Sequence, residues 1–310
     1  MAGNEISLES MIQAKPVDVE AVNEWLVNYG KWLFSEGKPF YHFSETINAV
    51  VASRPSLRRS MQQAWDLAFM WGSHEPPEHH QAMPAQVLIA LVCVAWTWGW
   101  KVEAAILALS WGALLRIGEV LQAYRSDLVL PEDVGNTVSY ALLRILEPKT
   151  RFRTARHQAG KLEQADLVQI VTIGFRSLDR HQKLWAWSGQ TLRNRFEKLL
   201  KRLHLPTLPH QTPKPLSLAS LRPGGATWLI GETESPETVR RKGRWQSFRT
   251  MDIYLQEVSA TTYLNDISAE AKDVILQAYH LFPSMLIQVS KFDRCCIPEA
   301  TWYFLFTQEA

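Results

Sequence analysis

Residues 216–257 read LSLASLRPGGATWLIGETESPETVRRKGRWQSFRTMDIYLQE, and they decide the architecture of the second half of the chain. Residues 235–243 have the pattern of one short helix, because a serine N-cap followed by proline begins helices and glycine ends them. Ser247 is placed to cap a further helix, which we expect to carry Tyr254. A short helix also fits 223–230, with Arg222 at its start. The stretch therefore predicts a succession of short helices that carry an arginine, a tryptophan and a tyrosine.

Two earlier segments carry polar side chains in equally specific places. Residues 114–121 read LLRIGEVL, which puts Arg116 among apolar residues at the start of a helix. Glu119 follows one turn later, where a carboxylate can hold the guanidinium by a fork-type pair. Residues 147–151 read EPKTR between two strand-like runs, which predicts a hairpin with Lys149 at its tip.

Taken in order, these motifs resemble the catalytic domain of the tyrosine recombinase (phage integrase) family. The resemblance is strongest over 107–125, 145–151 and 216–257, and it includes a tyrosine nine residues after the tryptophan of Gly243-Arg244-Trp245. The N-terminal helices are similar to that family's core-binding domain only in class and position. Among its members, the integrase-like genes of eukaryotic mobile elements are the most similar.

The resemblance implies cleavage and rejoining of DNA through a covalent 3′-phosphotyrosine, without a metal or a nucleotide cofactor. Arg116 and Arg222 would bind the non-bridging oxygens of the phosphate, since guanidinium groups present forks of donors to such oxygens. Tyr254 would be the nucleophile, activated by nearby cations because a phenol has a pKa of about 10. Lys149 would protonate the leaving 5′-oxygen. Trp245 would donate to the phosphate or pack behind the tyrosine.

One position departs from the family, whose members have a histidine three residues before the second arginine. Ala219 occupies that position here. The reaction then runs impaired, or Ser217, Ser220 or His210 partly substitutes, or the chain is a catalytically inactive DNA-binding relative. A topoisomerase-like relaxing enzyme and a helical scaffold that binds no DNA are further alternatives. Tyr263 is a nearby rival nucleophile, but it lacks the nine-residue offset from the tryptophan.

Composition and hydropathy patterning favour a mainly α protein with a small antiparallel sheet, an α+β class. The 310 residues are 46% hydrophobic, as in an ordinary globular protein. We expect a helical DNA core-binding domain over 1–75, a linker over 76–84, the catalytic domain over 85–290 and a C-terminal tail over 291–310. The three cysteines form no disulfide framework, which indicates a reducing compartment. The expected location is therefore intracellular, with DNA, and nuclear if the source is eukaryotic.

Apolar patterning gives more detailed expectations within these boundaries. The apolar run between 87 and 115 is broken by polar residues and reads as two core helices rather than a membrane hairpin. Strands are predicted over 127–130, 137–145, 151–156 and 167–173, and helices over 56–71, 175–187, 190–203 and 268–287.

The distribution of charge points to double-stranded DNA as the partner. The net charge is only +2, but residues 149–249 hold 20 basic and 7 acidic side chains, whereas residues 1–80 hold 6 and 10. A block this basic is a candidate surface for a polyanion. The predicted phosphate contacts are Arg151, Arg153, Arg193, Arg195, Lys198, Arg240, Arg241, Lys242 and Arg244. The family resemblance implies a homotetramer on two DNA sites, and no membrane association is expected.

Overall fold

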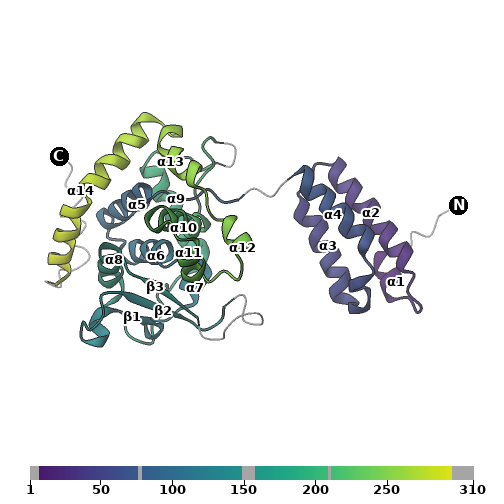
Figure 1. Cartoon of the computed structure of the whole chain (residues 1–310), viewed down its shortest axis with the longest axis horizontal. Helices are drawn as coiled ribbons and strands as arrows, with labels where there is room; N and C mark the ends of the chain where they lie inside the picture. Colours follow the sequence, from purple (N-terminus) through teal and green to yellow (C-terminus); the bar gives the residue numbers. More distant parts are fainter. Residues whose placement is uncertain (1–6, 76–78, 149–157, 209–210, 295–310) are drawn as a thin grey trace. The chain divides into compact units, whose positions relative to one another are not determined.

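The computed structural model describes residues 7–75, 79–148, 158–208 and 211–294 of the chain (Figure 1). The chain divides into two compact units, residues 1–78 and residues 79–310. Over the described residues the fold is mostly helical with one small antiparallel sheet, so the α+β class expected from the sequence is confirmed.

The first unit consists of helices α1 (Leu8–Gln13), α2 (Val19–Ser35), α3 (Phe40–Ser53) and α4 (Gln62–His74). Its core includes Leu26 of α2, Phe43 and Ile47 of α3, and Trp71 of α4, which are 3% exposed or less. The third helix was expected from residue 56, but Pro55–Arg59 form the 3-10 helix η1 and α4 begins only at Gln62. Proline at the first helical position favours such a tight turn at this point.

Two helices, α5 (Ala85–Thr97) and α6 (Lys101–Gly112), form the centre of the second unit. They are buried on nearly all sides, as the sequence predicts for two core helices, and α6 contacts both α8 (Ala165–Phe175) and α10 (Leu221–Thr233). The long helix α14 (Ala269–Arg294) packs along α5. No helix in the described part of the chain has the length and hydropathy needed to cross a membrane.

The sheet has the order β1-β2-β3, formed by Leu128–Val129, Ala141–Ile145 and Gln158–Leu162. Both pairings are antiparallel, and Leu143 lies opposite Leu128 on one side and Gly160 on the other. The predicted strand over 167–173 is wrong because these residues belong to α8, a buried helix whose short apolar run has no period to distinguish it from a buried strand. The predicted strand over 151–156 lies outside the described residues.

The other helices of the second unit are short. The predicted helix over 175–187 is wrong, since α8 ends at Phe175 and turns follow until α9 (Gly189–Arg202). Tyr254 was expected within a helix, but α12 (Phe248–Asp252) ends before it and α13 (Glu257–Asp266) begins after it. The remaining elements are α7 (Ile117–Gln122), η2 (Arg125–Asp127), η3 (Pro131–Val134), η4 (Leu218–Ser220) and α11 (Pro236–Gly243).

Candidate active site

One buried carboxylate, that of Glu119, holds two arginines. Arg116 is the N-cap of α7, and the Glu119 side chain accepts hydrogen bonds from its backbone nitrogen (2.9 Å) and from its Nη1 (3.1 Å). Arg244 donates from Nη2 to Glu119 Oε2 at 2.7 Å, although the two residues are far apart in sequence. The carboxylate therefore fixes two guanidinium groups beside each other, one from α7 and one from the end of α11.

A third arginine, Arg222, lies over two neighbouring aromatic rings at the start of α10. It is 4% exposed and donates from Nη2 to the carbonyl oxygen of Gly243 at 2.6 Å. Its guanidinium carbon is 4.6 Å from the centre of the Trp245 ring and 5.6 Å from that of Tyr254. The two rings are themselves 5.0 Å apart. The structure thus brings Arg116, Arg222, Trp245 and Tyr254 together with Glu119.

The turn after α11 directs Arg244 into this group. Arg244 has a left-handed backbone conformation, with φ 59° and ψ 34°, which costs about 1–2 kcal/mol for a residue with a side chain. The Trp245 ring covers Gly243, and a Cβ atom at that position would overlap the ring. Glycine at 243 therefore lets the tryptophan fold back over the turn, and strain at Arg244 is of the kind found at functional sites.

Several donors in this cluster are buried without a partner. Arg222 Nε and Nη1, Arg244 Nε and Nη1, and Trp245 Nε1 have no hydrogen-bond acceptor among the described residues. Burial lowers the pKa of Arg222, and the positive charges of Arg116 and Arg244 lower it further, whereas Glu119 raises it. Burial also lowers the pKa of Arg244. Since buried donors without acceptors are costly, the cluster is suited to receive an anion with several oxygen atoms.

The two tyrosines that could act as nucleophile have different surroundings. Tyr254 is half-buried, and its backbone carbonyl accepts a hydrogen bond from Thr227 of α10 at 3.2 Å. Tyr263 is 1% exposed within the main core, and burial raises the pKa of its phenol. Only Tyr254 is accessible at the cluster of arginines.

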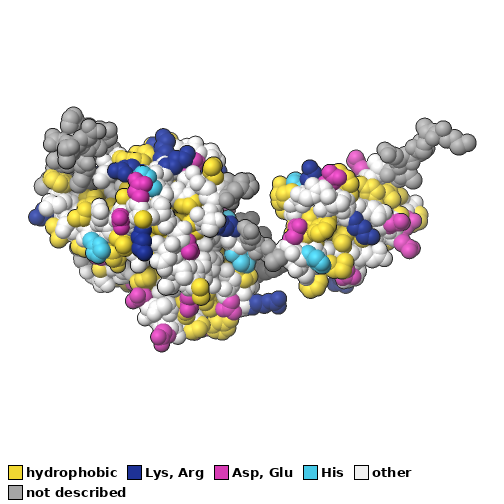
Figure 2. All heavy atoms as spheres, turned by 90° about the horizontal axis from the view of Figure 1, so that it is seen from above, with side chains coloured by type: hydrophobic (Ala, Val, Ile, Leu, Met, Phe, Trp, Pro, Cys, Tyr) yellow, Lys and Arg dark blue, Asp and Glu magenta, His cyan; other side chains and the backbone are white. Residues whose placement is uncertain are grey.

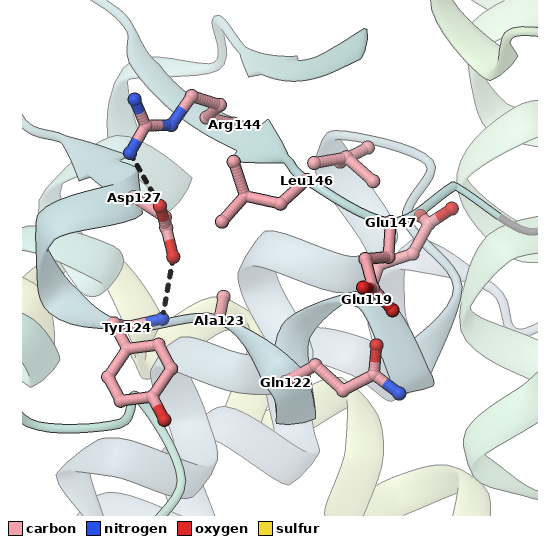
Figure 3. Close-up of a pocket in the computed structure, with 9 residues that line it drawn as sticks. Glu119, Gln122, Ala123, Tyr124, Asp127, Arg144, Leu146 and Glu147 are labelled. Carbon is pink, nitrogen blue, oxygen red and sulfur yellow. Dashed lines mark hydrogen bonds and ion pairs between the residues drawn. The ribbon is translucent and has the colours of Figure 1, made fainter. Parts of the chain in front are cut away.

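Lys149, the predicted general acid, lies outside the described residues, but the chain that leads to it reaches the site. Glu147 and Glu119 line one pocket together with Gln122, Tyr124, Asp127 and Arg144. Figure 3 shows the carboxylates of Glu119 and Glu147 facing the same end of this pocket. The segment after β2 therefore passes next to the carboxylate that holds Arg116 and Arg244.

Position 219 has no polar side chain, although the family resemblance implies a histidine there. Ala219 lies in η4, is exposed, and lines a shallow groove with Ser217 and Arg193. Ser220, which the sequence offered as a substitute, is fully buried, and its hydroxyl accepts a hydrogen bond from the Ser217 backbone at 3.0 Å. Ser220 is thus occupied in the turn before Arg222. His210, the other substitute, lies outside the described residues.

Eight of the nine predicted phosphate contacts of the basic block separate into three groups. Arg193, Lys198 and Arg241 are exposed, whereas Arg151 and Arg153 lie outside the described residues. Arg195, Arg240 and Lys242 are engaged in ion pairs with Glu103, Glu237 and Glu163 respectively. Figure 2 shows that Lys and Arg side chains on the visible face of the second unit gather in one place and are otherwise scattered among acidic ones.

Arg244 is the residue whose place the sequence reasoning missed. It was expected on the DNA-facing surface, but its side chain is 10% exposed and lies inside the site. The glycine before it and the tryptophan after it were the available signal, because a glycine at a helix end permits the chain to turn back sharply.

Comparison with known proteins finds similarity to solved structures only, among them a recombinase. No family model matches the chain, and no curated protein matches it. Among solved structures, the crystal structure of XerA recombinase is similar at 15% sequence identity and a TM-score of 0.42. The match covers 83% of this chain and 96% of that one. The function proposed below therefore rests on the side chains of the site.

Proposed function

We propose that this chain is a DNA strand transferase of the tyrosine recombinase type. It cleaves and rejoins double-stranded DNA through a 3′-phosphotyrosine bond to Tyr254. In this proposal the chain acts as a homotetramer on two DNA sites, inside the cell, with the first unit as the core-binding domain. A mobile-element integrase is the member of the family that we favour.

The observation that supports this proposal is the set of buried donors beside a phenol. Arg222, Arg244 and Trp245 hold five nitrogen atoms without acceptors in the described part of the chain, and the Trp245 ring contacts the Tyr254 ring at a tilt of 48°. A phosphodiester offers two non-bridging oxygens, and these gain charge when phosphorus is attacked. Donors placed before the reaction at such oxygens accelerate it by about 10²–10³ each.

The reaction balances without a further reactant. The Oη atom of Tyr254 forms a bond to phosphorus, the bond from phosphorus to the 5′-oxygen breaks, and the 5′-oxygen takes up one proton while the phenol loses one. The bond energy is conserved in the phosphotyrosine ester, so the reverse attack by a 5′-hydroxyl rejoins a strand. Lys149 is the proposed donor to the 5′-oxygen.

A second function, DNA binding without cleavage, is favoured by one observation. Ala219 offers only a methyl group at the exposed start of the segment that leads to Arg222. Loss of a group that handles a proton reduces rates by about 10²–10⁴, which could leave a binding protein. Both functions require DNA, and they differ in whether a covalent adduct forms.

The test begins with DNA selected for binding. Duplexes with a random central segment are selected by gel shift, and the bound sequence is then made with a nick that lets the released fragment, which carries the new 5′-hydroxyl, diffuse away. The wild-type chain should accumulate a covalent adduct on this DNA. Tyr254→Phe should abolish the adduct and leave DNA affinity unchanged, because it removes one hydroxyl and no charge.

Tyr263→Phe is the matched control, and it should retain the adduct because Tyr263 lies in the core. If Tyr254→Phe still forms the adduct and Tyr263→Phe does not, then Tyr263 is the nucleophile and the assignment to Tyr254 is wrong. Tight binding without any adduct, on every selected duplex, would leave DNA binding as the function.

A further inference from the structure

The segment that leads into α5 is fixed against the start of α10, beside Arg222. The backbone nitrogen of Met83 donates to the carbonyl oxygen of Ser220 at 3.2 Å, and Trp111 Nε1 donates to the carbonyl oxygen of Met83 at 3.0 Å. A Cβ atom on Gly224 would lie 2.8 Å from the Met83 nitrogen. The glycine after Pro223 therefore allows this close approach of the two backbones.

The same segment is tied to the residues that follow Tyr254. Gln256 accepts a hydrogen bond from the backbone nitrogen of Ala82 at 2.9 Å and donates one to the carbonyl oxygen of His80 at 2.8 Å. Thr227 links Gln256 to α10, since its hydroxyl accepts from the Gln256 nitrogen at 3.1 Å and donates to the Tyr254 carbonyl. The Gln256 side chain thus connects the backbone of His80 to a position two residues after Tyr254.

The imidazole of His80 lies beside the N-cap of η4, whose residues 218–220 include no ionisable side chain. Its Nδ1 is 3.4 Å from Oγ of Ser217, which is two residues before Ala219. The ring is exposed, so a bound phosphodiester can reach it. His79, the neighbouring histidine, has only a backbone contact, from Lys214 to its carbonyl oxygen, among the hydrogen bonds of the described residues.

We propose that His80 supplies the imidazole that position 219 lacks, and that it accepts the proton which Tyr254 loses as it attacks phosphorus. The inference rests on the proposed function. The proton moves from Tyr254 Oη to the neutral imidazole, the new bond forms between Oη and phosphorus, and the imidazolium returns the proton when the strand is rejoined. Nothing is oxidised or reduced.

The charges around the ring are consistent with a proton acceptor. Burial lowers the pKa of His80, and the charges of Lys214 and His79 lower it further, so the imidazole is neutral at pH 7. Ser217 and Gln256 are its other polar neighbours, and neither is charged. The described arginines around Tyr254 are cations and cannot accept a proton. The carboxylate of Glu119 is already hydrogen-bonded to Arg116 and Arg244.

The experiment measures single-turnover adduct formation by the full chain on the nicked duplex described above, between about pH 5 and pH 9. Wild type should lose activity toward the acid end of this range, because His80, whose pKa is lowered from that of an ordinary histidine, becomes protonated there. His80→Ala should be slower by about 10²–10⁴ at neutral pH with the same DNA affinity, and it should lose this acid limb. His79→Ala is the matched control and should keep the wild-type rate at neutral pH and retain an acid limb.

Two further variants test whether His80 accepts a proton or only holds Ser217 in place. His80→Asn keeps a polar side chain that can bond Ser217 but accepts no proton, so it should be as slow as His80→Ala. The double variant His80→Ala/Ala219→His should recover adduct formation, since it returns an imidazole to the same region from η4.

A wild-type rate in His80→Asn or His80→Ala, or an unchanged pH profile, would overturn the role of His80 and leave the proposed function standing. Failure of wild type itself to form an adduct on DNA that it binds would overturn the proposed function, and the role of His80 with it.

Discussion

The guanidinium group of Arg222 is stacked on Trp245, with its central carbon 4.6 Å from the ring centre. Contacts of this kind between a cation and an indole contribute about 2 kcal/mol where water is excluded. The same arginine donates to the carbonyl oxygen of Gly243, so the turn that places the ring also places the cation. Movement of Trp245 should therefore displace Arg222.

Gly243→Ala tests the coupling through the turn. The added methyl group would overlap the Trp245 ring, and such overpacking typically costs about 1–3 kcal/mol. We expect a lower midpoint of denaturant unfolding and slower adduct formation, because the ring and Arg222 shift together. Gly231→Ala is the control, since nothing lies near a Cβ atom there and alanine is favoured within a helix such as α10. Equal midpoints in the two variants would contradict the role given to Gly243.

Glu119→Gln tests the compensation of charge in the site. The substitution removes the carboxylate that pairs with Arg116 and Arg244 and leaves the buried Arg244 and the half-buried Arg116 without a counter-charge. Breaking a buried pair in this way costs about 3–5 kcal/mol. We expect a clear loss in the free energy of unfolding, measured by urea denaturation without added anions.

Inorganic phosphate should then stabilise Glu119→Gln more than wild type, since an anion bound to the folded state replaces the lost charge and raises its stability. Glu237→Gln is the control, because Glu237 pairs with Arg240 on an exposed part of α11 and should change neither quantity appreciably. A phosphate response that is equal in all three proteins would argue against an anion site at these arginines.

Helices that begin at an N-cap serine were predicted correctly from the sequence. The prediction failed for a buried segment whose residues are apolar on most sides. Ser235 and Ser247 cap their helices as expected, since each accepts a hydrogen bond from the nitrogen three residues later. The error over 167–173 arose because α8 is apolar on most sides, and short apolar runs fit a strand or a helix equally well.

The site shows the same division between local and distant information. The spacing of Trp245 and Tyr254 is local, and the sequence could place them together. The contact between Arg244 and Glu119 joins α11 to α7, and the approach of His80 to Ser217 joins the start of the second unit to η4. Contacts between residues so far apart depend on how the helices pack, which no single stretch of sequence encodes.

DNA affinity should depend steeply on salt if the exposed cations contact phosphates. Each neutralised phosphate adds about −0.9 to the slope of log affinity against log salt concentration. Lys198→Ala and Arg241→Ala each remove one exposed cation and should lower the magnitude of the slope by about one. Fluorescence anisotropy over a salt series measures this directly. A slope near zero for the wild type would exclude DNA as the partner.

Arg195 should behave differently from Arg193, although they lie two positions apart on α9. The Arg195 guanidinium lies over the rings of Trp100, Trp185 and Trp187 at 5.2, 5.6 and 4.9 Å and is paired with Glu103. Glu103 is 3% exposed, so the pair joins α9 to the core helix α6. Its main contribution is therefore expected to be structural rather than to DNA binding.

Arg195→Ala leaves the buried carboxylate of Glu103 without its ion-pair partner and removes the packing against three indoles. We expect it to lower the free energy of unfolding by about 3–5 kcal/mol while the salt slope of DNA binding changes little. Arg193→Ala should do the reverse, because Arg193 is exposed and its Nε bonds only to Gln190 of the same helix at 3.0 Å. The double variant Arg195→Ala/Glu103→Gln should recover part of the stability, since it removes the unpaired charge. A loss of salt slope in Arg195→Ala without a loss of stability would return this arginine to the DNA-contacting surface.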